Sequence, residues 1–590
     1  MSLAADETGA SPVALNDTGG IGGHPRGLTT LFYTEMWERF SFYGMKALLV
    51  LYMTKSVAEG GLNFSESYSG LIAATYFSSV YWTPLIGGWL ADKVFGARRA
   101  VLIGGIVIAS GHFSMVFHTM PNFYAGLILI AAGTGMLKPN VSAMVGDLYT
   151  EEDKRRDAGF SIFYMGINLG AFIAPLICGN LGEKVDWHYG FAAAGIGMVL
   201  GIIQYLLPFT VKVNLRLIVA TVAFVVGGLL ERLFWNAVYC TPGPILYMIG
   251  AAIAAFILGL IATHLFLKYR KRPTHTTTDA PNGKWIYLIH GYPLKAVGVP
   301  PSKRREIVKP DIKETRDIAG ETGGVDVVTI ALAVVVGIIG FALGYVYGGA
   351  GVLSGLFPGV AGFFAGYLAG VVRHLSGDEL KRVLVIFILF VFSALFWMSF
   401  EQASTTLTLF ADRLTDRTFM CLEIKASLFQ SIEPFFLIIF APAFAWLWIR
   451  LGRREPSSPA KFAYGLFFAG VSFAVVAFAS TLTGAGKVSP LWLVLVYLLQ
   501  TIGELCLSPV GLSTVTKLSP ARMVGLMMGV WFLSISIGDY FAGLVLGLFN
   551  DKAEGALLRL FGIVALVTFA AAIVLALLTP LIKKMTPRAT

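Results

Sequence analysis

The chain has 590 residues, of which 56% are hydrophobic and only 14% are charged, and its mean hydropathy is +0.72. A soluble protein of this size carries charge on about a quarter of its residues, so the composition excludes a soluble fold and predicts a membrane protein. The net charge of +10 does not indicate nucleic-acid binding, because Lys and Arg lie at the ends of apolar stretches, as in cytoplasmic loops.

Residues 1–27 are polar and rich in Ala, Gly and Ser, without the apolar core of a signal peptide. We expect a disordered cytoplasmic tail, followed by a first span that acts as its own insertion signal. Stretches of about 20 apolar residues predict spanning helices. Six lie in the first third, at about 28–54, 68–91, 99–118, 121–148, 158–180 and 189–209. Four follow, at about 214–235, 244–268, 327–348 and 351–372. Six close the chain, at about 382–411, 427–450, 461–481, 490–516, 522–549 and 556–582.

This order predicts an all-α polytopic membrane protein in which two six-helix bundles, 28–209 and 380–582, flank an inserted region, 210–379. The insert contains a basic polar segment at about 270–325, and residues 583–590 form a short tail. Counting two or four inserted helices gives 14–16 spans. Lys and Arg concentrate in alternate loops, which places both termini in the cytoplasm. Two six-helix bundles are the layout of the major facilitator fold, in which substrate binds between the halves near the bilayer midplane.

The loop between the second and third spans contains an acid, glycines and arginines that resemble the cytoplasmic gate motif of the major facilitator superfamily. An ordinary helix connector could carry such a turn, but its position between two spans favours the superfamily motif. The motif residues are Gly88, Asp92, Gly96, Arg98 and Arg99.

The first span carries charged residues on one face. Glu35, Glu38 and Arg39 lie at i, i+3 and i+4, and Tyr43 and Lys46 continue the stripe. A charge inside a span costs several kcal/mol unless it is paired or faces a cavity. A structural ion pair is the simpler explanation, but three ionisable groups followed by a tyrosine favour a functional site.

The segment from Glu35 to Phe40 resembles the E-x-x-E-R-F signature of the proton-dependent oligopeptide transporter (POT) family. Further segments resemble the same family across both bundles: 133–142 with Lys138, 163–170 with Asn168, 396–402 with Glu401, and 503–512 with Glu504. Three residues depart from the family pattern. Phe42 replaces one of two tyrosines, Glu433 replaces an asparagine before a proline, and Asp539 is an acid for which we expect a structural hydrogen bond.

The resemblance implies a proton-coupled symporter that imports di- and tripeptides by alternating access. A peptide is a zwitterion, so its site needs cations for the carboxylate and anions for the ammonium. The first bundle supplies Arg39 and Lys138, and the second supplies Glu401 and Glu504. The predicted substrate-binding residues are Arg39, Tyr43, Tyr76, Lys138, Asn168, Trp397, Glu401, Glu433, Glu504, Ser508, Trp531 and Ser534.

The same carboxylates can carry protons, because burial raises a carboxyl pKa and a nearby cation lowers it. We expect Glu35, Glu38, Arg39 and Lys138 to form one coupling cluster. Glu401 is then the second, mobile proton site, and Glu504 binds the peptide ammonium group.

The remaining expectations concern partners. The chain has no phosphate-binding loop, so protons are the coupling ion and no other cofactor is expected. The four cysteines lack ligand spacing and the eight histidines do not cluster in sequence, so no metal is expected, and His112 and His118 should be structural. We expect a monomer in the plasma membrane (the inner membrane of a bacterium) that binds short peptides and lipid. Two alternatives remain: a related facilitator for nitrate, a modified amino acid or a drug, and, remotely, a membrane-embedded enzyme, although no catalytic constellation is present.

Overall fold

The computed structural model describes residues 17, 19–149, 153, 155–206, 326–375, 377–419, 422–520 and 523–586, with a few more between 251 and 261. Within these ranges the regular elements are helices, apart from one antiparallel pair of two-residue strands, β1 (Thr418–Phe419) and β2 (Leu422–Glu423), and an isolated bridge between Thr415 and Val488. The expected spans at 214–235 and 244–268 and the polar segment at 270–325 fall almost wholly outside the described residues.

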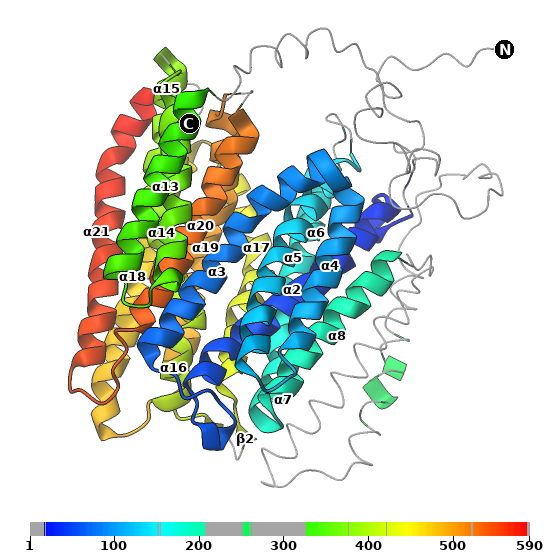
Figure 1. The fold of residues 1–590 in the computed structure, drawn as a ribbon, viewed down its shortest axis with the longest axis vertical. Helices are drawn as coiled ribbons and strands as arrows, with labels where there is room; N and C mark the ends of the chain where they lie inside the picture. The colour runs from blue at the N-terminus through cyan, green and yellow to red at the C-terminus, as the bar shows by residue number, and fades with distance from the viewer. Residues whose placement is uncertain are drawn as a thin grey trace, which may run out of the picture.

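The N-terminal half contains six long helices (Figure 1). They are α2 (Arg26–Thr54), α3 (Glu66–Leu90), α4 (Ala97–Ser114), α5 (Met120–Gly146), α6 (Arg156–Ala174) and α8 (Trp187–Leu206). A π turn at Pro175–Gly179 and the short α7 (Asn180–Lys184) extend α6. The turn begins at a proline, which has no N–H to donate to the preceding turn.

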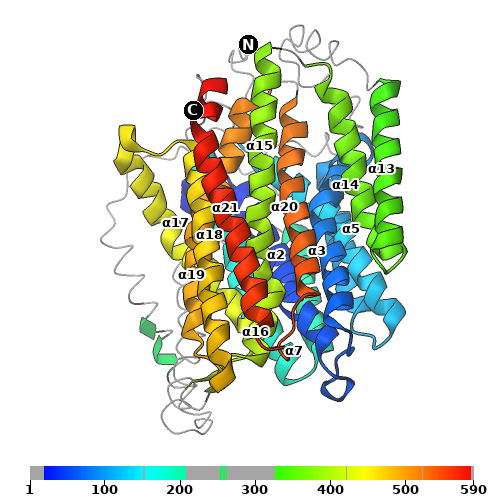
Figure 2. The same cartoon turned by 90° about the vertical axis from the view of Figure 1, so that its left-hand side faces the viewer.

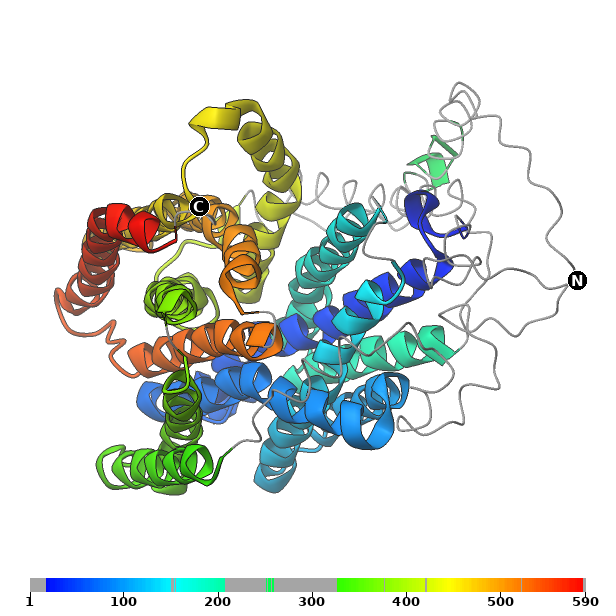
Figure 3. The same ribbon diagram turned by 90° about the horizontal axis from the view of Figure 1, so that it is seen from above.

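The C-terminal half also contains six long helices. They are α15 (Gly377–Phe400), α17 (Ile432–Leu451), α18 (Ser458–Thr481), α19 (Leu491–Leu518), α20 (Val524–Leu546) and α21 (Ala556–Met585). After α15 the chain continues through a 3-10 turn (Glu401–Ser404) into α16 (Thr406–Arg413). Seen from above, the two halves stand side by side (Figure 3).

Two inserted helices, α13 (Val327–Tyr347) and α14 (Val352–Val372), form a hairpin outside the halves. The hairpin lies beside α3 and α20 (Figure 2). The ring of Phe357 on α14 stacks on that of Tyr540 on α20, with centroids 4.1 Å apart. The hairpin therefore contacts the seam at which the two halves meet.

Small residues let α3 and α20 approach closely along this seam. A Cβ atom added to Gly543 would lie 2.5 Å from the backbone nitrogen of Ala74, and one added to Gly70 would lie 2.4 Å from the Gly543 carbonyl oxygen. Gly543 and Gly547 form a G-x-x-x-G sequence, a pattern that allows close packing of membrane helices.

Eleven described helices, counting each continuous run once, are long and apolar enough to cross a membrane. The first three helices of the N-terminal half are not among them. Polar and charged side chains lower the hydropathy of α2 in particular, which carries Glu35, Glu38, Arg39 and Lys46. Below, the proximal end is the end at which α2 begins and α21 finishes, and the distal end is the end at which α2 finishes and α21 begins.

Candidate functional site

The acidic stripe of α2 folds into one buried ion cluster. The Arg39 guanidinium Nε lies 3.2 Å from a carboxylate oxygen of Glu35 and also pairs with Glu38, and the three side chains are at most 3% exposed. One oxygen of each glutamate and one terminal nitrogen of Arg39 have no hydrogen-bond partner. One cation thus faces two carboxylates, and the cluster keeps unused donors and acceptors for a ligand or a proton.

Lys138 on α5 lies within electrostatic range of this cluster without joining it. It interacts with Arg39 and with both glutamates over a longer distance, while its ammonium nitrogen sits 3.8 Å from the centre of the Tyr81 ring. Lys138 is half-buried and forms no ion pair with any described residue. Its charge is therefore held by an aromatic face and remains available to an anion.

A second ion cluster joins the two halves. Lys46, two helical turns beyond Arg39, pairs with Glu401 at the break between α15 and α16, and its Nζ lies 3.9 Å from Asp539 on α20. Asp539 is fully buried, and its expected structural hydrogen bond stays a prediction. The Glu401 carboxyl group also faces Asp539. Two buried acids thus share one lysine.

A third group of polar residues lies between α6, α17 and α19. The carboxyl groups of Glu433 and Glu504 face each other, and the Tyr164 hydroxyl faces Glu504. Glu504 is 9% exposed, and one of its oxygens has no partner. Neither glutamate forms an ion pair with a described residue, so this acidic pair has no resident cation.

Other predicted residues lie around these clusters. Tyr43 interacts electrostatically with Arg39 and with three glutamates of the C-terminal half, Glu401, Glu433 and Glu504. Tyr76 and Trp397 are buried, each with a polar atom that has no hydrogen-bond partner. The Asn168 side-chain amide instead donates to the backbone oxygen of Tyr164 at 2.9 Å, which fixes its orientation.

Three further predicted residues of the C-terminal half differ in their surroundings. Ser508 is half-buried on α19. Trp531 packs its ring against Gly511, where an added Cβ would lie 2.1 Å from the ring. Ser534 is fully buried, and its hydroxyl is 2.8 Å from that of Ser393. This contact gives Ser534 a packing role between α15 and α20, and its predicted contact with substrate stays a prediction.

The loop motif at 88–99 forms a tight connection at the proximal end. A π turn (Ala91–Phe95) extends α3, and Gly96 has a φ of +78° before α4 begins, a conformation that favours glycine. Asp92 is exposed and forms no helix cap or ion pair with the residues described. Arg98 is half-buried, and its backbone oxygen accepts a hydrogen bond from Tyr205, while Arg99 is exposed.

Ion pairs between the halves also close the distal end. Lys55 Nζ is 2.8 Å from a carboxylate oxygen of Asp412, and Arg413 is 2.9 Å from Glu66. Arg417 lies 3.8 Å from Glu183. The Glu183 carboxylate also accepts hydrogen bonds from the backbone N–H groups of residues 426 and 427, at 3.2 and 2.9 Å. These pairs give Arg413 and Arg417 partners in the opposite half.

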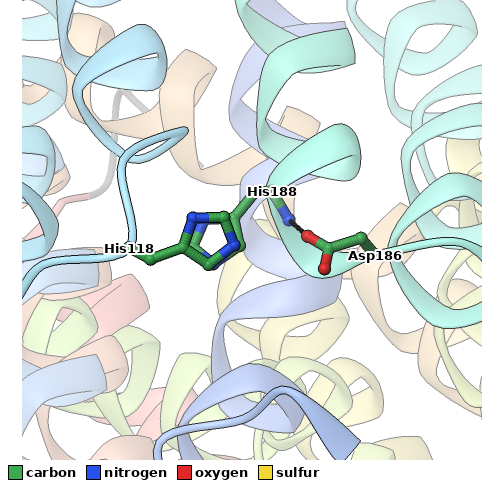
Figure 4. Close-up of side chains that lie close together, drawn as sticks. All are labelled: His118, Asp186 and His188. Atoms are coloured by element: carbon green, nitrogen blue, oxygen red, sulfur yellow. Dashed lines mark hydrogen bonds between the residues drawn. The ribbon is translucent and has the colours of Figure 1, made fainter.

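The histidines of the N-terminal half depart partly from expectation. His112 is buried and hydrogen-bonded to the Ser41 hydroxyl at 2.6 Å, which fits a structural residue. His118 and His188, however, lie together although 70 residues separate them, with ring centroids 3.7 Å apart and Asp186 beside them (Figure 4). The expectation that the histidines do not cluster is therefore wrong in space.

Sequence reasoning named most of the charged residues but missed three partners. Lys46 was visible as a charge in the first span, but its partner was not, because Glu401 lies 355 residues away. Tyr81 gave no signal beyond being an aromatic residue on a spanning helix, and Tyr164 was included only within the segment 163–170, without a role of its own. Their roles became visible only when the helices were placed against Lys138 and Glu504.

Two six-helix halves with buried charges between them define the class of a helical membrane carrier with the facilitator architecture. The POT family model (PTR2) matches residues 98–231 and 366–560. The chain is 38% identical over 96% of its length to an uncharacterized transporter, YclF, of Bacillus subtilis, of which 96% is covered. It is 31% identical over 95% of its length to a di-/tripeptide transporter of Lactococcus lactis, of which 97% is covered.

A solved structure agrees with these relatives. The crystal structure of a peptide transporter POT in complex with sulfate covers 99% of each chain at 34% identity, with a TM-score of 0.68. The chain belongs to the POT family of transporters.

Proposed function

We propose that the chain is a proton-coupled symporter that imports di- and tripeptides by alternating access. The observation that carries the proposal is the placement of unpaired charges on opposite halves. Lys138 in the N-terminal half has no ion-pair partner among the described residues, and neither has Glu504 in the C-terminal half. A zwitterionic peptide between them supplies the missing partner to each.

The peptide carboxylate binds Lys138 and the free donor of Arg39, and the peptide ammonium group binds Glu504. Tyr43, Tyr76 and Trp397 supply apolar walls with polar edges, which accept different side chains. Relatives and a solved structure named as peptide transporters support this substrate class.

Proton coupling follows from the charge balance of the α2 cluster. Arg39 balances one of its two glutamates, and a bound peptide carboxylate draws Arg39 and Lys138 away from the other. A carboxylate that loses its cation in a buried site gains a proton more easily. Peptide binding and proton uptake therefore favour each other. Glu401, which Lys46 holds, is the second proton site and changes when the halves move.

The membrane potential supplies enough free energy for one coupled proton to drive accumulation of a peptide. One proton that crosses about 100 mV releases about 2.3 kcal/mol, which supports roughly 50-fold accumulation of a neutral dipeptide because about 1.4 kcal/mol corresponds to a factor of ten. Protons are the only coupling ion in this proposal, and the protein catalyses no covalent reaction. The proximal end faces the cytoplasm of a bacterial cell, and one chain suffices for transport.

The test is uptake of labelled dialanine into proteoliposomes with an inside-negative potential and an inward proton gradient. We expect accumulation above equilibrium that a protonophore abolishes. Glu35→Gln should lose driven uptake but keep peptide exchange, and Glu504→Gln should lose both. Glu554→Gln, which changes an exposed acid outside the site, is the matched control. If the wild-type chain neither takes up nor exchanges a short peptide, the peptide assignment is wrong.

A further inference from the structure

Two histidines and an aspartate meet at the distal end of the N-terminal half, away from the charged site. His118 lies in the loop between α4 and α5, and Asp186 and His188 lie at the start of α8 (Figure 4). One ligand atom from each residue lies within 4.8 Å of the others. The three side chains thus converge from two segments of the chain that are distant in sequence.

The hydrogen bonding of His188 leaves one ring nitrogen free to bind a metal ion. His188 Nδ1 is 2.6 Å from the backbone carbonyl oxygen of Met115. Because a carbonyl oxygen only accepts, Nδ1 carries the proton, and in the neutral ring Nε2 presents a lone pair. A backbone carbonyl that holds the second nitrogen is the usual way in which proteins orient a metal-binding histidine. His188 is buried against Tyr52 and Phe191, so its ring position is fixed.

The other two residues have the chemistry and freedom that a metal site needs. Asp186 caps α8, since one of its carboxylate oxygens accepts from the backbone N–H of His188 at 2.8 Å. A carboxylate can bind a metal ion and keep such a bond. His118 is exposed, so its side chain can adjust.

The ring geometry permits both histidines to bind one ion. The planes of the His118 and His188 rings are inclined to each other at 44° and therefore intersect along a line. An ion near this line of intersection lies close to both ring planes. Zinc ligands at about 2.0–2.1 Å in a tetrahedral site stand about 3.3 Å apart. The ligand atoms therefore need to close by about 1.5 Å at most, which the exposed His118 can supply.

We propose that His118, Asp186 and His188 form a binding site for a divalent transition-metal ion, with Zn²⁺ as the preferred ion and water as the fourth ligand. Two imidazoles and one carboxylate suit zinc, copper or nickel, whereas calcium and magnesium prefer oxygen ligands. The ion joins the α4–α5 loop to the start of α8. Both segments belong to the N-terminal half, so the site stabilises that half and takes no part in binding the peptide.

The test is zinc binding by isothermal titration calorimetry on tag-free, chelator-treated protein in detergent, with thermal unfolding as a second readout. We expect one Zn²⁺ per chain and a rise in melting temperature. His118→Phe keeps an aromatic ring against His188 but removes the ligand, and it should abolish both effects. Asp186→Asn keeps a helix-capping oxygen and should weaken binding at least about tenfold, the lower limit usual even for indirect metal contacts.

The control is His374→Phe, which removes another exposed histidine at the proximal end and should bind zinc as the wild type does. If the wild-type chain binds no zinc at 1 mM, the proposal is wrong. If His118→Phe binds zinc as tightly as the wild type, the zinc is adventitious and the proposal is equally wrong. Size-exclusion profiles show whether each variant folds. None of these readouts requires transport, so the result is independent of the proposed peptide function.

Discussion

Neutralising Asp412 should favour the state of the protein in which the distal end is open. Its carboxylate, 5% exposed, lies 2.8 Å from Lys55 of the opposite half and 3.3 Å from Arg417 of its own half. Of these two pairs, only the one with Lys55 joins the halves and breaks when they separate at this end. The change Asp412→Asn therefore weakens the closed state relative to the state that opens distally.

The size of the effect follows from that one pair. At an effective dielectric constant of about 20, unit charges 2.8 Å apart attract each other by roughly 6 kcal/mol. Hydration offsets most of this attraction, because both charges regain water when the distal end opens and Lys55 is already 25% exposed. Lys55 also keeps Glu59 at 3.5 Å. A net of about 1.4 kcal/mol remains, which is about a tenfold shift toward distal opening.

The assay measures access to the site from the distal side. A single cysteine is placed at Ser508 in a chain whose four native cysteines have been replaced, and a membrane-impermeant maleimide is added from outside the cell. We expect Asp412→Asn to label about ten times faster than its parent. Asp551→Asn is the matched control, because Asp551 pairs with Arg413 inside the same half. Equal labelling of Asp412→Asn and its parent would refute the reasoning.

Three further predictions concern packing and specificity. Gly543→Val should lower the melting temperature by a few degrees, because overpacking costs about 1–3 kcal/mol. Gly562→Val is the control, because a Cβ atom at that position meets open space, and its melting temperature should not fall. Equal melting temperatures of the two variants would contradict the close contact between α3 and α20. Ser534→Ala should lower stability by roughly 0.6 kcal/mol and leave the KM for dialanine unchanged, and a raised KM would restore its predicted role in substrate binding. Glu433→Gln removes the carboxyl group that faces Glu504, so competition by lysyl-alanine against dialanine uptake should weaken several-fold, and unchanged competition would show that this carboxyl group is not used.

The local part of the site was readable from the sequence because it depends on one helix. The spacing of Glu35, Glu38 and Arg39 puts them on one face whatever surrounds α2, and the structure has them in one cluster. The charge of Lys46 was equally visible. Its pairing with Glu401 and Asp539 was not, because it depends on how helices from two halves pack.

The same limit applies to other residues whose partners lie on another helix. The sequence shows neither the lysine beside Asp539 nor the contact of Ser534 with Ser393 between α15 and α20. His118 and Asp186 lie in connecting segments, whose path the apolar pattern of the spans does not determine. The positions of the spanning helices were predictable, because about 20 apolar residues are needed to cross a bilayer. The continuation of α6 into α7 and of α15 into α16 was not, because it depends on local turns after Ala174 and Phe400.

Charged side chains make ion pairs at three positions along α2 and its C-terminal end, so a tilt of this helix at one position moves the ion pairs at the others. Arg39 sits in the α2 ion cluster, Lys46 holds the acids of the opposite half, and Lys55 follows the last helical residue and reaches Asp412. Arg39 and Lys55 are 16 positions apart, which at 1.5 Å per residue is about 24 Å. A tilt of about 10° that pivots near Arg39 moves Lys55 by about 4 Å, more than the length of its ion pair. Binding of a proton or a peptide near Arg39 can thus break the Lys55–Asp412 ion pair at the distal end, while α2 tilts as a rigid helix.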